Sequence, residues 1–284
     1  MRADFKKYWP ILVIIIGSVL LWSYLVWLLA DDYYAAFISE DPYTEERYNI
    51  FSNLYYGISP LWGLLAVVPF LLCIKLFSFR TTAGKAWLLL TVSMVLWFLG
   101  DFFYSFVWFV FHTEDLPSIH FGRVCYIIGY FAILLGMALQ LKAGGMKLEK
   151  REVEAIAITE GAFLAVSLFL CVIPLIALPV DGVYIVEELD KWILIFYLIF
   201  DEVNVVLAIL LIFKYRGGQF SKGWLVIAAG FMAEAAYDMI YSYMYYILQL
   251  DNSWYVFEPI YYIVYVLLAV GAVYLFIATR SAHA

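Results

Sequence analysis

The chain has 284 residues, of which 66% are hydrophobic, 20% are aromatic and only 14% are charged, with a formal net charge of −7. So little charge excludes a soluble globular domain and indicates that lipid is the main surrounding medium; we expect no nucleic-acid partner. Apolar segments of roughly 20 residues, the length that crosses a bilayer, occur at 9–30, 54–79, 86–111, 118–142, 155–178, 191–214, 223–249 and 254–279. The sequence therefore predicts an all-α, polytopic membrane protein with eight transmembrane helices.

The first apolar segment follows Arg2, Lys6 and Lys7. Its run of roughly 20 residues exceeds the apolar core of a signal peptide, so we expect a retained helix. With both termini cytoplasmic, the inner side would hold 14 of the 17 basic residues, as the positive-inside rule requires. The sequence thus predicts a multi-pass protein of the cell membrane, with an acidic outer face that concentrates cations.

An internal repeat relates the two halves of the chain. The stretch "GKAWLLLTVSMVLWFLGDFFYSFVWFV" (84–110) aligns without gaps on "SKGWLVIAAGFMAEAAYDMIYSYMYYI" (221–247), including Asp101 on Asp238. In the next helix the matching residues are Tyr126, Tyr130 and Gly136 with Tyr261, Tyr265 and Gly271. We therefore expect two parallel four-helix repeats, 1–145 and 146–284; substrate sites in such proteins often lie between repeats.

Seven acidic residues fall within the predicted spans: Asp101, Glu160, Asp201, Glu202, Glu234, Asp238 and Glu258. An unpaired acid in a membrane costs a few kcal/mol or more, so such residues face a bundle interior or a wet cavity. Glu234, Asp238, Tyr241 and Tyr245 form one helical stripe at positions i, i+4, i+7 and i+11. This stripe predicts a polar inner face in the second half.

The two halves differ at one aligned position, where Arg123 corresponds to Glu258. We expect Arg123 to form a structural ion pair with Asp101, and the acids of the second half to lack a basic partner in their own spans. The predicted binding residues for a proton, a cation or a cationic small molecule are Glu234, Asp238, Glu258, Asp201, Tyr241, Tyr245, Tyr261 and Tyr265. The alternative is that Asp101 and Asp238 simply hydrogen-bond to neighbouring helices.

Motifs for catalysis, cofactor binding and metal binding are absent or weak in this sequence. The sequence lacks a P-loop, a dinucleotide fingerprint, a nucleophile elbow and an HExxH motif, so it predicts neither catalytic residues nor a cofactor. The loop "HTEDLPSIH" (112–120) has metal-ligand residue types without a diagnostic spacing, and we expect no metal site there. The three cysteines fit small core residues.

The pattern "LWFLGDFFYSF" (96–106) followed by "PSIHFGRVCYIIGYFAILLGM" (117–137) resembles the polytopic membrane modules that precede cyclic-nucleotide-signalling and kinase output domains in prokaryotes. Those modules have a Gly-Asp pair in one helix and a tyrosine-containing helix after a Pro-Ser loop. The second copy, about residues 221–279, departs from this pattern with Tyr237 at the glycine position. The resemblance implies a sensor, and because the sequence stops at Ala284 without an output domain, it also implies a separate signalling partner.

Three functions are consistent with these features. The first is a sensor or binding protein with an outward-facing acidic pocket inside the membrane. The second is a secondary transporter of protons or cations, which needs a path to the cytoplasm that Glu160 could line. The third is a non-catalytic subunit of a larger membrane complex.

Overall fold

The computed structural model describes residues 42–77, 79–111, 116–143, 149–177, 188–248 and 254–283, without the side chains of 42–55, 254–259 and 281–283. This part of the chain is helical and contains no strand, which confirms the predicted all-α class. The helices are α2 (Pro42–Ile74), α3 (Thr82–Phe111), α4 (Phe121–Lys142), α5 (Lys150–Ser167), α6 (Ile173–Ala177), α7 (Glu188–Tyr215), α8 (Ser221–Tyr241) and α9 (Trp254–His283).

Seven helical segments of the described chain are long and apolar enough to cross a membrane: Tyr56–Ile74, Thr82–Phe111, Phe121–Lys142, Lys150–Ala177, Glu188–Tyr215, Ser221–Ile247 and Ile260–Arg280. They correspond to the last seven predicted spans and support a multi-pass membrane architecture. The first predicted span, 9–30, lies outside the described residues. The position of the termini relative to the membrane stays a prediction.

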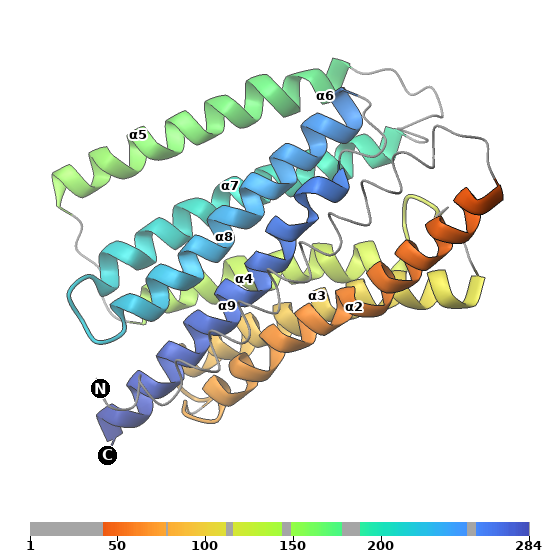
Figure 1. The fold of residues 1–284 in the computed structure, drawn as a ribbon. Coiled ribbons are helices and arrows are strands. Elements are labelled where there is room, and N and C mark those ends of the chain that lie inside the picture. Colours follow the sequence, from red (N-terminus) through yellow and green to blue (C-terminus); the bar gives the residue numbers. More distant parts are fainter. Residues whose placement is uncertain are drawn as a thin grey trace.

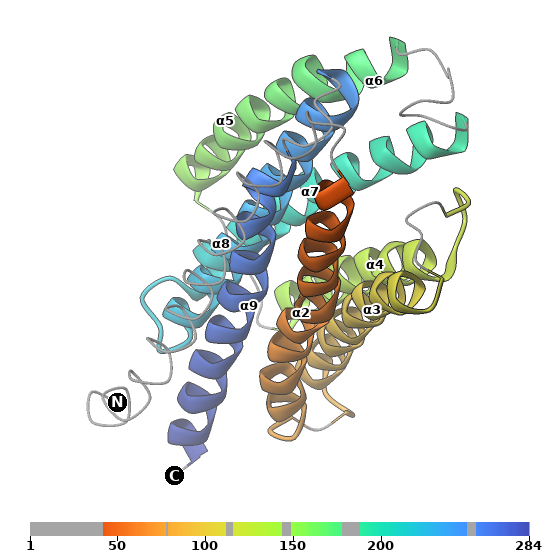
Figure 2. The same ribbon diagram turned by 45° about the vertical axis from the view of Figure 1, so that its right-hand side comes forward.

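Six helices form a closed ring in which each packs against two neighbours (Figures 1 and 2). The order around the ring is α2, α3, α4, α7, α8 and α9, and α9 packs back against α2. Helix α5 lies outside this ring and packs mainly against α7. The ring therefore joins the two halves of the chain along two seams, α4 against α7 and α9 against α2.

Side chains satisfy backbone groups at both ends of α4, locally at its start and across the α4–α7 seam at its end. His120 caps the N-terminus of α4, where its side chain accepts a hydrogen bond from the backbone N–H of Arg123. At the other end of α4, Lys214 of α7 donates to the carbonyl oxygens of Gln140 and Leu141 at 2.5 and 2.6 Å. Because lipid cannot satisfy free backbone groups, these contacts stabilise the two ends of α4.

Two spans contain a π-helical segment, one at Leu168–Val172 between α5 and α6 and one at Ser242–Ile247 after α8. The two segments lie against each other. Cys171 donates a hydrogen bond from its thiol to the Met239 carbonyl oxygen at 3.4 Å. A π-helical turn shifts the side chains that follow it around the helix axis, so the predicted Glu234–Tyr245 stripe is not regular along its length.

The same glycine packing occurs in α4 against α3 and in α9 against α8. A Cβ atom at Gly136 would lie 2.9 Å from Cγ of Leu90, and one at Gly271 would lie 2.5 Å from Cγ1 of Ile227. Leu90 and Ile227 are themselves aligned at the repeat offset. Close helix approach therefore depends on the absence of a side chain at both glycines.

A pair of glycine-to-alanine changes tests this packing. Gly271→Ala should lower stability by about 1–3 kcal/mol, because its Cβ would also meet the Gly223 carbonyl oxygen at 2.9 Å and the backbone cannot yield easily. Gly161→Ala, in α5 with nothing within 4 Å of the added Cβ, should be neutral or stabilising. Thermal unfolding in detergent is the measurement, and equal midpoints for the two variants would contradict this account of the α8–α9 contact.

Candidate binding pocket

A pocket of about 360 Å³ lies inside the ring and receives side chains from all six ring helices. Its volume falls within the usual range for small-molecule sites. It lies towards the end of the bundle where α3 ends and where α4 and α7 begin, which is the predicted outer end. Ten tyrosines line it: Tyr56, Tyr104, Tyr126, Tyr130, Tyr197, Tyr237, Tyr241, Tyr245, Tyr246 and Tyr261.

The structure brings most of the predicted site residues to this pocket. Its wall includes Glu234, Asp238, Tyr241, Tyr245 and Tyr261 of the predicted binding set, together with Asp101 and Arg123 of the predicted ion pair. Asp201 and Tyr265 are buried behind the wall. The side chain of Glu258 lies outside the described residues. The pocket thus lies between the two halves, whereas we expected it within the second half.

Arg123 pairs with Asp190 and not with Asp101, so the predicted ion pair is wrong in its acidic partner. The Arg123 guanidinium also donates to the Ser118 carbonyl oxygen at 2.8 Å. The predicted span 191–214 leaves Asp190 in the preceding loop, but α7 begins at Glu188 and places Asp190 in its first turn. A carboxylate is favourable at a helix N-terminus, and here it also meets the cation of the adjacent helix α4.

Asp101 is satisfied by three tyrosine hydroxyls instead of a cation. Tyr126 of α4 donates to its Oδ1 at 2.5 Å, and Tyr261 of α9 donates to the same atom at 3.0 Å. Tyr265 of α9 donates to Oδ2 at 2.7 Å. The carboxyl group is only 4% exposed, so these bonds replace the water that it would otherwise bind. This arrangement is the one that a purely structural role for Asp101 would require.

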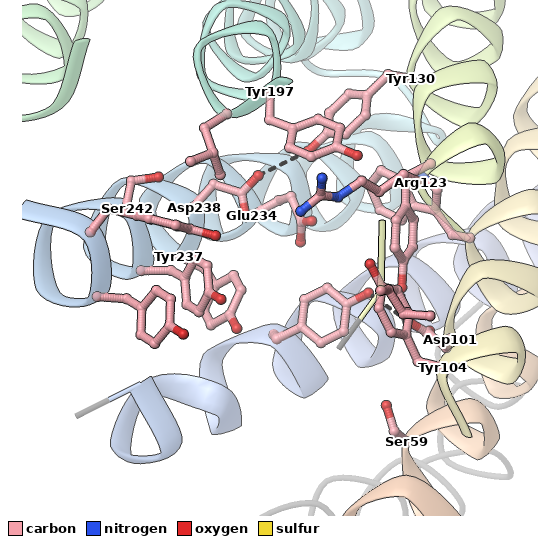
Figure 3. Close-up of a pocket in the computed structure, with 18 of the residues that line it drawn as sticks. Ser59, Asp101, Tyr104, Arg123, Tyr130, Tyr197, Glu234, Tyr237, Asp238 and Ser242 are labelled. Carbon is pink, nitrogen blue, oxygen red and sulfur yellow. Dashed lines mark hydrogen bonds between the residues drawn. The ribbon is translucent and has the colours of Figure 1, made fainter. Parts of the chain in front are cut away.

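Asp238 has a different set of neighbours. Tyr130 of α4 donates to its Oδ2 at 3.1 Å, and Figure 3 shows this bond together with the stacked ring of Tyr197. The carboxyl group of Asp201, on α7, is within hydrogen-bonding reach of Asp238. One tyrosine and one acid therefore contact Asp238, where three tyrosines contact Asp101.

Sequence reasoning missed seven pocket tyrosines: Tyr56, Tyr104, Tyr126, Tyr130, Tyr197, Tyr237 and Tyr246. A signal existed for two of them, because Tyr126 and Tyr130 align on Tyr261 and Tyr265 in the repeat. Tyr197 shares a helix face with Asp201, which was a second available signal. Tyr246 lies in the π-helical segment, where α-helical spacing does not predict which side chains face inward.

The pocket carries more negative than positive groups. Asp101, Glu234 and Asp238 lie on its wall, whereas its one guanidinium, Arg123, is paired with Asp190. Aromatic faces and carboxylates together attract cations, and organic ammonium groups in particular. No group of three or more potential metal ligands occurs in the described chain, although His112, Glu114 and Asp115 of the loop motif lie outside it.

No protein-family model, curated protein or solved structure matches this chain. The resemblance of residues 96–137 to sensor modules therefore stays a prediction. Any function has to be inferred from the pocket and from the residues that build it.

Removing the Arg123 guanidinium should destabilise the α4–α7 seam. Its side chain is 22% exposed and that of Asp190 is 12% exposed, so we expect Arg123→Leu to cost about 2–3 kcal/mol, between the values for exposed and buried pairs. The double variant Arg123→Leu/Asp190→Leu should recover part of this loss, because no carboxylate is then left without its cation. Chemical denaturation in detergent measures both.

The matched control for that pair is Lys150→Leu, which breaks an ion pair with Glu154 whose side chains are 91% and 56% exposed. This change should be close to neutral. If Arg123→Leu were no more damaging than Lys150→Leu, the Arg123–Asp190 pair would not contribute to stability.

His120 should make the protein sensitive to acid. Burial and the neighbouring Arg123 lower the pKa of His120 to about 4. An unfolded histidine has a pKa of about 6.5, so the unfolded chain binds more protons between these values. Stability from this group is thus fully present above about pH 6.5 and is lost as the pH falls towards 4. Protonation would also end the capping bond to α4, because Nδ1 could no longer accept it.

We therefore expect the melting temperature of the wild type to fall from pH 6.5 to pH 4 more steeply than that of His120→Asn. Asparagine keeps a capping oxygen but does not titrate. Melting curves across this pH range compare the two proteins. Parallel pH profiles would show that His120 does not contribute to the acid sensitivity.

Proposed function

We propose that this protein is a membrane binding module that takes up a small organic cation from the outer side of the membrane. The observation that carries the proposal is the placement of Glu234 and Asp238 on the wall of a tyrosine-lined pocket whose one guanidinium is paired with Asp190. An ammonium group there would contact aromatic faces and carboxylates inside the ring of helices. Both interactions strengthen as the local dielectric constant falls.

The finer architecture belongs to the same proposal. We infer that the chain forms two parallel four-helix repeats, with the predicted span 9–30 as the eighth helix and both termini cytoplasmic. The equivalent glycine packing in α3–α4 and α8–α9 supports the repeat. A second support is that aligned tryptophans of the two halves, Trp87 and Trp224, meet in the core at 5.7 Å between ring centroids.

A sensor would use the same pocket to transmit a signal. A ligand between two halves favours the arrangement of the halves that it fits best, and a separate partner protein could read that arrangement. Transport would need a continuous polar path to the inner side. Glu160, the acid that such a path requires, lies between α5 and α7 beside Glu202 and does not line the pocket. This geometry favours binding over transport.

Tetramethylammonium is a suitable probe because it carries a positive charge and has no hydrogen-bond donors of its own. We expect the purified protein in lipid nanodiscs to bind tetramethylammonium more tightly than sodium at equal ionic strength. Glu234→Gln should weaken binding of this probe about tenfold, because a carboxylate on the pocket wall is replaced by a neutral amide. Calorimetry and the fluorescence of Trp97, which lines the pocket, provide two readouts.

The matched control is Glu154→Gln, an identical change on the exposed surface of α5, which should leave affinity unaltered. Equal affinities of Glu234→Gln and the wild type would contradict the assignment of the pocket. Equal binding of sodium and tetramethylammonium would contradict the role of the tyrosine rings.

A further inference from the structure

Asp201 is buried directly behind the pocket wall. It lies on α7, is 2% exposed, and in the described part of the chain no hydroxyl or N–H group donates to either of its carboxylate oxygens. Asn204 lies one turn further along the same face of α7, is equally buried, and its side-chain oxygen also lacks a donor there. These oxygens would be left unsatisfied in a medium of low dielectric constant, which requires an explanation.

We propose that a proton shared between Asp201 and Asp238 is a second ligand of this site, and that a cation entering the pocket displaces it. The proposal rests on the proposed function, since the displacing cation is the one that the pocket would bind. Asp201 and Asp238 are within hydrogen-bonding reach of each other, and Asp238 reaches the pocket while Asp201 does not. The pair therefore connects the buried acid to the ligand.

One shared proton would remove the repulsion between the two carboxyl groups. Two ionised carboxylates within hydrogen-bonding reach of each other would repel strongly in a buried site. With one proton, the carboxylic acid of Asp201 donates to the carboxylate of Asp238, which also accepts from Tyr130 at 3.1 Å. On displacement, the O–H bond of the acid breaks and the proton leaves through the pocket to solvent. No electrons are transferred.

The other ionisable groups around Asp201 determine the sign of the coupling. From α8, Glu234 adds negative charge that helps to retain the proton, and from α4 the hydroxyl of Tyr130 lies nearby and donates to Asp238. On α7 itself, Tyr197 lies on the same face. Glu202 lies on another face and pairs with Glu160 of α5.

Across the pocket, the guanidinium of Arg123 is paired with Asp190, and Asp101 is bound by tyrosines. A bound cation would stabilise a second negative charge at Asp201–Asp238. Binding should therefore release a proton, and affinity should rise with pH by up to about tenfold per pH unit.

Calorimetry in buffers of different ionisation enthalpy measures the protons released when tetramethylammonium binds to the protein in nanodiscs. We expect release of a fraction of a proton per cation in the wild type. Asp201→Asn should bind without release, since its amide donates to Asp238 permanently and cannot titrate. Glu160→Gln, a carboxyl-to-amide change outside the pocket, should release as many protons as the wild type. Binding by the wild type without proton release, or unchanged release in Asp201→Asn, would overturn the proposal.

Infrared spectra of the protein without cation separate this proposal from the proposed function. A protonated-carboxyl band that is present in the wild type and reduced in Asp201→Asn supports the shared proton, and an unchanged band overturns it. Where Asp201→Asn does not fold, Asp238→Asn serves for the same comparison. Failure of the wild type to bind tetramethylammonium in any buffer would overturn the proposed function, while the infrared result still decides whether the acids share a proton.

Discussion

Hydrogen bonds from tyrosine hydroxyls to buried carboxyl groups hold the ring of helices together around its pocket. A carboxylate inside a membrane needs donors, since lipid supplies none. Asp101 of α3 takes its donors from α4 and α9, and Asp238 of α8 takes one from α4. The bonds to Asp101 from α9 and the bond to Asp238 from α4 cross between the halves of the chain, so separating the halves would leave both acids without their cross-half donors. Ring closure, pocket position and acid burial therefore depend on one another.

The two acids occupy equivalent places in the repeat but have different surroundings. Tyr265 bonds to Asp101 across the halves, and its aligned counterpart Tyr130 bonds to Asp238 in the reverse direction. On the α2 side, a Cβ atom at Gly63 would lie 3.2 Å from Oδ2 of Asp101, so that helix presents only a hydrogen there. On the α7 side, a second acid faces Asp238. Asp101 is thus bound by three tyrosine hydroxyls, whereas Asp238 lies beside a second carboxyl group with which we propose that it shares a proton.

Hydropathy and the helical period predicted the features that depend on local sequence, which are the spans and their inward-facing polar residues. The seven described spans and the inward stripe of acids follow from the requirement that lipid contact apolar side chains. The partner of Arg123 could not be predicted in this way, because it depends on which turn of α7 lies level with α4. The two π-helical segments also escaped prediction, since periodicity assumes 3.6 residues per turn throughout. Contacts between helices depend on how each helix is rotated about its own axis and on how far it is shifted along its neighbour. The sequence of a single helix specifies neither.

The tyrosines both stabilise the contacts between helices and form the wall of the pocket. A tyrosine presents a neutral hydroxyl donor at the end of a rigid apolar ring, so it can reach a carboxyl group on another helix without bringing in a charge. The same rings form the wall of the pocket in which we propose that a cation binds. Tyr130 has both roles, since it lines the pocket and donates to Asp238. A ligand that engages Asp238 must therefore alter a bond that joins α4 to α8, and in this way occupancy of the pocket is coupled to the contact between the two halves.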